Sequence, residues 1–132
     1  MPSRVPLAHT RERHTIAKLF IDLTVEMRMS LFGDQTVRRD TGIGTLLMVG
    51  AAVVVGHAEA RPMNATKISL YVNLPRSTVQ RKLDQLQQLG VIVRRGNAYC
   101  LSPSRAGNIP PEYVKRSARI ITEAAKRLTR EV

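Results

Sequence analysis

Apolar residues recur at helical spacing in two long segments near the ends of the chain. From Thr10 to about Phe32 the apolar positions follow steps of four, three, four and four residues, the period of an α-helix. This stripe consists of Ile16, Phe20, Leu23, Met27 and Leu31. After Pro110 and Pro111 the steps are four, three, four and three, a heptad-like seam that predicts a second amphipathic helix. Its stripe consists of Val114, Ala118, Ile121, Ala125 and Leu128.

The most apolar run lies between these segments. It is IGTLLMVGAAVVVG, a run of 14 residues from Ile43 to Gly56 that is apolar nearly all round. A span of the bilayer needs roughly 20 such residues, so the run predicts a buried central helix, about Thr41 to Ala58. Asp40 or Thr41 is suited to cap this helix by accepting its free backbone N–H groups.

A short helix, a tight turn and a second helix are expected next. Asn64 is a good N-cap for a helix over Ala65–Val72. Asn73 tolerates the positive φ that a tight turn between two helices needs, and Pro75 suits the start of the following helix. That helix has one apolar stripe, formed by Val79, Leu83, Leu86 and Leu89. Its opposite face is polar throughout and carries Ser77, Arg81, Asp84 and Gln88, flanked by Thr78, Gln80 and Gln85.

A β-hairpin is expected after Gly90, which ends the second helix. The segments VIVRR and AYCL are rich in strand-forming residues and are separated by Gly96 and Asn97, two residues that both accept positive φ in a two-residue turn. This arrangement places Arg94 and Arg95 beside the tip. The patterns together predict a mainly α-helical chain with a small two-stranded β-hairpin, while the segment SPSRAGNIPP is expected to be a linker.

The segment MNATKISLYVNLPRSTVQRKLDQLQQLGVIVRRGNAYCLS resembles winged helix-turn-helix bacterial transcription regulators, most closely the MarR family and locally the IclR type. The matching residues are Ala65, Thr66, Ile68, Leu74, Pro75, Ser77, Thr78, Val79, Arg81, Leu83, Leu86, Gly90, Ile92 and Arg94. Two features depart from the family. Asn73 stands at the usual turn glycine, and the two-residue turn is short for a MarR-type wing, which argues against deep insertion of the tip into the minor groove.

The resemblance implies a winged helix-turn-helix whose N- and C-terminal helices form a homodimer. On that basis we expect an N-terminal helical arm at residues 1–40, a DNA-binding domain at residues 41–105 and a C-terminal dimerisation helix at residues 106–132. The expected dimerisation residues are Ile16, Phe20, Leu23, Met27, Val114, Ala118, Ile121, Ala125 and Leu128. Relatives of this kind often respond to a small molecule, and the sequence identifies no such effector.

The charge of the chain is concentrated in its middle. The whole chain has 21 Lys and Arg against 10 Asp and Glu, a net charge of +11, which favours binding to polyanions. Residues 61–105 hold eight basic residues and one acid, Asp84, a net charge of +7. Asp84 can orient Arg81 or Gln88 over one helical turn, or it can simply be solvated. For any single charge the alternative interpretation is a solvated helix face.

The expected DNA-binding residues lie on the two motif helices and the hairpin. They are Thr66, Lys67, Arg76, Ser77, Thr78, Gln80, Arg81, Gln85, Arg94 and Arg95. In a major groove, arginines at 76 and 81 can donate in pairs to guanine and glutamines at 80 and 85 can pair with adenine. Ser77 and Thr78 can reach phosphates or bases, whereas the lysine at 67 and the wing arginines would neutralise phosphates.

Other kinds of chemistry find no support in the sequence. His9, His14 and His57 are scattered and Cys100 is the only cysteine, so no metal-ligand spacing exists and no internal disulfide can form. No nucleotide-binding loop or catalytic set is evident, and no cofactor is expected. The N-terminal stretch MPSRVPLAHTRERHT lacks the apolar region of a signal peptide. We therefore expect a cytoplasmic, nucleoid-associated protein without membrane contact.

The expected function is that of a homodimeric, sequence-specific regulator of transcription that binds double-stranded DNA and is not an enzyme. Its recognition helix would enter the major groove, and its two-fold symmetry would call for an operator with an inverted repeat. Two alternatives stay open. One is a winged-helix module for protein interaction or assembly in replication, partition or phage and plasmid complexes, and the other is an RNA-binding protein. The scarcity of aromatic residues disfavours single-strand binding by base stacking.

Overall fold

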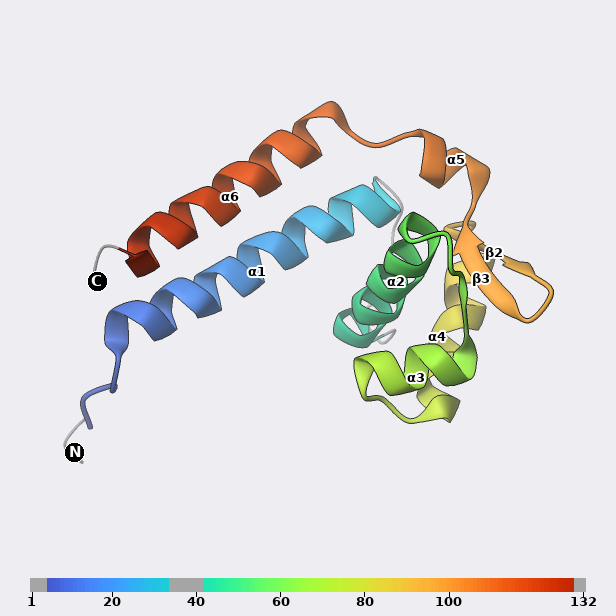
Figure 1. The fold of residues 1–132 in the computed structure, drawn as a ribbon, viewed down its shortest axis with the longest axis horizontal. Helices are drawn as coiled ribbons and strands as arrows, with labels where there is room; N and C mark the ends of the chain where they lie inside the picture. Colours follow the sequence, from blue (N-terminus) through green and yellow to red (C-terminus); the bar gives the residue numbers. More distant parts are fainter. Residues whose placement is uncertain (1–4, 34–41, 130–132) are drawn as a thin grey trace. The chain divides into compact units, whose positions relative to one another are not determined.

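The computed structural model describes residues 5–33 and 42–129, and within them the chain is mainly helical with one small antiparallel sheet (Figure 1). It forms two compact units. The first unit comprises Met1–Met27 and Pro110–Val132, and the second comprises Arg28–Ile109. The first division falls inside the N-terminal helix, earlier than residue 40, because Leu31 and Phe32 at the end of that helix are buried in the second unit.

Within the described residues, no helix is both long enough and apolar enough to cross a membrane.

The first unit is a pair of antiparallel helices. Helix α1 (Thr10–Phe32) has the bounds that its apolar spacing predicts, and α6 (Pro111–Thr129) begins at the second of two consecutive prolines. The two helices lie side by side and run in opposite directions (Figure 1). An ion pair of 2.8 Å joins Arg116 Nε of α6 to Glu26 Oε1 of α1.

The second unit is built around α2 (Ile43–Ala58). This helix contacts two further helices and the sheet, and its inward-facing residues such as Leu46, Val49 and Val53 are fully buried, as expected for a helix that is apolar nearly all round. Gly42, at φ 73°, occupies the N-cap position and provides no side-chain cap. Asp40 and Thr41, which we expected to cap this helix, lie outside the described residues.

Two helices joined by a short turn follow. The N-cap prediction for α3 (Ala65–Val72) is confirmed, because the backbone N–H of Lys67 donates to Asn64 Oδ1 at 2.8 Å. Asn73 has φ 56° and ends the helix in the left-handed conformation, which confirms the turn prediction. Helix α4 (Arg76–Gln88) then begins, with Pro75 at its N-cap position.

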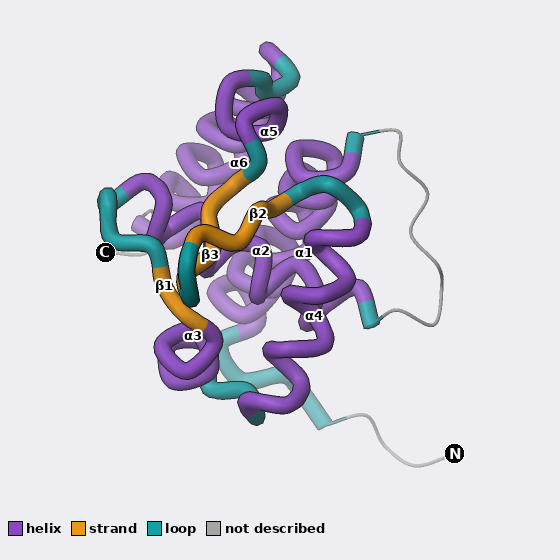
Figure 2. Tube along the Cα trace, turned by 90° about the vertical axis from the view of Figure 1, so that its right-hand side faces the viewer, coloured by secondary structure: helices purple, strands orange, loops and turns teal. Residues whose placement is uncertain are grey.

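The sheet has three strands, one more than the sequence indicated. Strands β2 (Ile92–Arg95) and β3 (Ala98–Leu101) form the predicted hairpin around the turn at Gly96 and Asn97. Strand β1 (Met63–Asn64) pairs antiparallel with β3, so the order in the sheet is β1-β3-β2. Figure 2 shows β1 leading directly into α3. A strand of two residues is too short to leave a periodic pattern, and its pairing partner is remote in sequence.

The segment expected to be a linker contains a short helix, α5 (Pro103–Gly107). The backbone N–H groups of Arg105 and Ala106 both donate to the carbonyl of Ser102, at 3.0 and 2.8 Å. Proline at the first helical position has no N–H that needs a partner. Five residues are fewer than two helical turns, so hydrophobic spacing could not reveal this helix.

Candidate nucleic-acid interface

Helix α4 presents two contrasting faces. Val79, Leu83 and Leu86 are completely buried, where they form part of the core beside α2 and α3. The opposite face is exposed and consists of Ser77, Arg81, Asp84 and Gln88. Helical periodicity predicts this division, and the structure confirms it. The exposed face is free to approach a large partner without disturbing the core.

Arg76 links the start of α4 to α3. Its guanidinium Nε donates to Thr66 Oγ1 at 3.0 Å, and both residues are exposed. A guanidinium has five N–H donors, so this bond orients the Arg76 side chain while four donors stay available. Lys67, the next residue of α3, is exposed as well. The exposed side chains in the first turns of α3 and α4 therefore form one polar, cationic area.

The two glutamines expected to read adenine are placed differently from that expectation. Gln80 is half-buried, and its amide Nε2 donates to Asp84 Oδ1 at 3.0 Å and to Tyr99 Oη at 3.3 Å. Gln85 is half-buried and its Oε1 is enclosed by the protein. Pairing with adenine needs both the oxygen and the nitrogen of the amide. In Gln80 the nitrogen already donates within the protein, and in Gln85 the oxygen is buried, so neither amide is available for this pairing. Thr78, at the edge of the exposed face, is also half-buried.

Lys82 is a basic residue of α4 that does not contribute to the exposed surface. It is only 7% exposed, and the space beside Gly42 is occupied by its Nζ atom. Burial, together with the neighbouring positive charge of Arg81, lowers the pKa of Lys82 below its ordinary value. A count of charges in the sequence cannot separate this lysine from the cations that are accessible to a partner.

The β2–β3 hairpin adds two exposed arginines near its tip, Arg94 and Arg95. Arg94 Nε donates to the backbone carbonyl of Gly96 at 2.8 Å, so this side chain folds over the turn. Together with the helical residues, the exposed cations of this region are Lys67, Arg76, Arg81, Arg94 and Arg95, and the acid among them is Asp84. We call these six residues and the exposed Ser77 the cationic surface. It can attract a polyanion and donate hydrogen bonds to it.

The expected dimerisation residues lie at the surface of the first unit. Phe20 is 70% exposed and Ile121 is 50% exposed. Of the remaining seven, Ile16, Val114, Ala118 and Ala125 are exposed, whereas Leu23, Met27 and Leu128 are half-buried. The contact between α1 and α6 uses a different side of each helix, where Thr15 of α1 and Ala124 of α6 are buried. Neither predicted stripe is thus covered by the other helix of the pair.

The two stripes point to the same side of the helix pair. On α1 the stripe residues Ile16 and Phe20 each follow by one position a residue that faces α6, Thr15 or Leu19. One position corresponds to a rotation of about 100° around the helix axis. On α6 the stripe residues Ile121 and Ala125 likewise follow Ile120 and Ala124, which face α1, by one position, so the rotation around the helix axis has the same size and direction. In an antiparallel pair, equal displacements in the same sense lie on one side. We call these nine residues the apolar face of the first unit.

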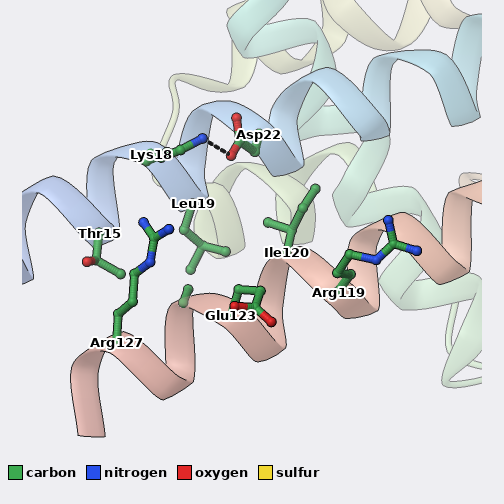
Figure 3. A pocket seen from close by; sticks show the side chains of 9 residues that line it. Thr15, Lys18, Leu19, Asp22, Arg119, Ile120, Glu123 and Arg127 are labelled. Atoms are coloured by element: carbon green, nitrogen blue, oxygen red, sulfur yellow. Dashed lines mark hydrogen bonds and ion pairs between the residues drawn. The ribbon is translucent and has the colours of Figure 1, made fainter. Parts of the chain in front are cut away.

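A cleft of about 190 Å³ lies between α1 and α6 within the first unit (Figure 3). Leu19 and Ile120 point toward each other across it, and Arg127 extends from α6 toward Thr15. Lys18 Nζ pairs with Asp22 Oδ2 at 2.9 Å. The cleft is lined by acids as well as bases and has no strong net charge, so it favours no particular class of ligand.

His57 and Cys100 lie where α2 packs against β3. His57 Nδ1 accepts a hydrogen bond of 3.1 Å from the backbone N–H of Leu101, which joins α2 to β3. Cys100 is buried in the neighbouring strand position. Over residues 5–33 and 42–129, no group of three His, Cys, Asp or Glu side chains is arranged to hold a metal ion.

Comparison with protein-family models, with curated proteins and with solved structures found no match to this chain. The function of the cationic surface has to be inferred from its own residues.

Proposed function

We propose that this protein is a sequence-specific DNA-binding regulator of transcription. In this proposal α3, the turn at Asn73 and α4 act as a helix-turn-helix, and the β2–β3 hairpin acts as a short wing, in a domain similar to those of the MarR family. The observation that carries the proposal is the cationic surface. Five exposed basic residues lie on α4 and on two elements that pack against it, α3 and the β2–β3 hairpin, while the other face of α4 is fixed in the core.

The chemistry of this surface fits the major groove of a DNA duplex. An α-helix fits into that groove, where arginine donates in pairs to guanine O6 and N7. Arg76 and Arg81 are the candidates for such contacts because both are exposed on α4. Lys67, Arg94 and Arg95 lie beside that helix and would neutralise phosphates, which fixes the position of the protein without reading sequence.

The apolar face of the first unit supports a homodimer as the active form. Monomeric proteins rarely expose large contiguous apolar patches, and two copies of this helix pair would cover theirs by packing face to face as a four-helix bundle. A two-fold dimer carries two copies of α4, so its operator is expected to contain an inverted repeat.

The proposal is tested by selecting bound sequences from a random duplex library with the full-length protein. We expect an inverted repeat, and duplexes with scrambled half-sites should bind at least tenfold more weakly. Arg81→Ala should weaken binding about 5- to 150-fold and relax the preference at one position in each half-site, as expected for loss of a bidentate base contact. Lys67→Ala should instead weaken all sequences alike and make binding less dependent on salt concentration.

Lys126→Ala provides the control, because Lys126 is an exposed base of α6 outside the cationic surface. It should leave both affinity and sequence preference unchanged. Equal affinity of the wild-type protein for intact and scrambled half-sites would exclude sequence-specific regulation. Tighter binding to structured RNA than to any duplex would favour an RNA-binding protein instead.

One observation favours a second candidate, a module for protein interaction or assembly. Leu70 on the outer side of α3 is 79% exposed, and Tyr71 beside it is exposed too. Exposed apolar side chains next to each other are common at protein–protein contacts. If this candidate is right, exchanging Arg76 and Arg81 for Glu will leave binding to nucleic acid unchanged, whereas Leu70→Asp will abolish binding to a partner protein.

A further inference from the structure

Asp84 is the one acid of the cationic surface, and it lies on the exposed face of α4 in line with Ser77 and Arg81. A carboxylate at this place repels the phosphates of DNA, and it can only accept hydrogen bonds. Its presence within a surface that otherwise attracts polyanions therefore calls for a specific function. The following inference rests on the proposed binding of DNA.

A hydrogen-bonded chain holds Asp84 in place from the core outward. Tyr99 of β3 is 3% exposed, and its strand is paired on both sides, with β1 and with β2. Its hydroxyl oxygen accepts one hydrogen bond from Gln80 Nε2, at 3.3 Å, and Asp84 Oδ1 accepts another from the same nitrogen, at 3.0 Å. Both bonds use donors of the Gln80 amide, so Gln80 cannot rotate without losing one of them.

This chain leaves a second carboxylate oxygen for a partner outside the protein. Among the described residues Asp84 makes the bond with Gln80 and no ion pair, although Arg81 is close in sequence. The side chain is exposed, so Asp84 Oδ2 is accessible to whatever faces α4. In a major groove, the bases that present an amino donor are cytosine, through N4, and adenine, through N6.

Of these two bases, cytosine is the better hydrogen-bond partner for a carboxylate. Adenine presents the acceptor N7 beside its amino group, and two acceptors that face each other repel. We propose that Asp84 selects a cytosine in each half-site by accepting a hydrogen bond from its N4 amino group, with Gln80 as the positioning residue. Guanine and thymine present acceptors at the corresponding edge, and they would leave the carboxylate beside oxygen atoms.

The test compares preferred duplexes selected with the wild-type protein and with Asp84→Ala at equal ionic strength. In the wild-type site, replacing one particular cytosine should weaken binding on the order of tenfold. Asp84→Ala should abolish the preference at that position, keep the preference at all other positions and bind unrelated duplexes more tightly, because a repulsive charge is gone. Asp84→Asn should shift the preference at the same position from cytosine toward adenine, the base that an amide side chain recognises.

Two further variants separate positioning from general effects of charge or folding. Tyr99→Phe removes the hydroxyl that accepts one of the two Gln80 hydrogen bonds, with a small change in volume, and it should reduce discrimination at the cytosine position alone. Glu59→Gln removes one negative charge from an exposed site at the end of α2, and it should leave every base preference intact. Circular dichroism should confirm that each variant is folded.

The outcomes distinguish this inference from the proposed function. An unchanged set of base preferences in Asp84→Ala overturns the inference and leaves sequence-specific binding standing. The inference is equally overturned if the position that loses its preference holds a base other than cytosine. If the wild-type protein binds all duplexes alike, both the inference and the proposed function are wrong.

Discussion

Lys82 is a single residue whose behaviour depends on its burial rather than on its type. It belongs to the same helix as Arg76 and Arg81, but it is buried while they are exposed. Burial removes water from the ammonium group, and Arg81 adds a like charge, so the pKa of Lys82 lies below its ordinary value of 10.5. The folded protein therefore binds the proton of Lys82 less tightly than the unfolded chain does.

This difference predicts a pH dependence that a substitution can isolate. Between the lowered pKa of Lys82 and its ordinary value of 10.5, the unfolded chain holds more protons, so the contribution of Lys82 to stability rises with pH. Lys82→Met has no such group. The difference in unfolding free energy between the wild type and Lys82→Met, measured with urea at several pH values from 7 to about 10.5, should therefore shift in favour of the wild type as pH rises.

The control for this experiment is Lys67→Met, the same chemical change at an exposed position of α3. Its difference from the wild type is the baseline against which the pH dependence of Lys82→Met is compared. A pH dependence of Lys82→Met equal to this baseline would show that the lysine has the same pKa in the folded and unfolded states.

Residues with a purely local role could be predicted from the sequence, whereas residues with remote partners could not. Asn64 caps α3 through a residue three positions away, and Asn73 adopts a positive φ in its own turn. Gln80 depends on Tyr99, which lies 19 positions away in the chain. Periodicity places Gln80 beside the polar face of α4 but gives no indication of this contact, so the sequence led to an expectation of base reading that its position in the structure does not favour.

At the scale of elements, two glycines of α2 have opposite surroundings. A Cβ atom on Gly56 would lie 3.0 Å from Arg61 O and 3.2 Å from Met63 N, which are backbone atoms, whereas a Cβ atom on Gly44 would meet nothing within 4 Å. The chain that leaves α2 thus passes directly over Gly56 on its way to β1. This close approach is reinforced by a hydrogen bond of 2.9 Å from the Arg61 N–H to the Gly56 carbonyl.

Gly56→Ala should therefore destabilise the protein by about 1–3 kcal/mol, because backbone atoms on both sides of Pro62 must move to admit the methyl group. Gly44→Ala should stabilise it by about 0.5 kcal/mol, because alanine loses less conformational freedom in a helix. Urea denaturation of both variants checks the pair. Equal effects of the two substitutions would mean that the segment after α2 does not pack against Gly56.

The lengths of the elements decided which of them the sequence could predict. The long helices α1 and α6 carry stripes that extend over several turns, and α4 has a polar and an apolar face, so periodicity identified all three. Strand β1 has two residues and helix α5 has five, each fewer than two periods of its pattern, and both were missed. Periodicity did not indicate which side of α1 contacts α6. The residues of α1 that face α6, such as Thr15 and Leu19, lie off the predicted stripe.

At the scale of the whole molecule, the apolar face of the first unit is large enough for a dimer. Helix α6 has 19 residues, which corresponds to a length of about 28 Å, and two adjacent helices of about 10 Å diameter give the side of the pair that carries the apolar face an area of about 560 Å² in projection. The accessible surface of such a face exceeds its projection. It is therefore comparable with the roughly 800 Å² that each partner buries in a standard interface.

Ile121 is the position at which a substitution tests the proposed dimer most directly. It lies in the middle of the α6 stripe and is 50% exposed in the single chain, so a glutamate there does not disturb the packing of α1 against α6. In a dimer the same carboxylate would be buried without a partner, which costs several kcal/mol for each copy. Ile121→Glu should therefore be monomeric in analytical ultracentrifugation at concentrations where the wild type is a dimer.

Thr122→Glu adds the same charge at the adjacent, exposed position, which lies off the stripe, and it should remain dimeric. Dimerisation also has a consequence for the proposed DNA binding, since two linked recognition helices bind an inverted repeat far more tightly than one alone. Ile121→Glu should accordingly bind an inverted repeat no more tightly than a single half-site, whereas Thr122→Glu should keep the advantage of the full site. A monomeric wild-type protein, or a dimeric Ile121→Glu, would show that a different surface or no surface joins two copies, and the expected two-fold operator would then have no structural basis.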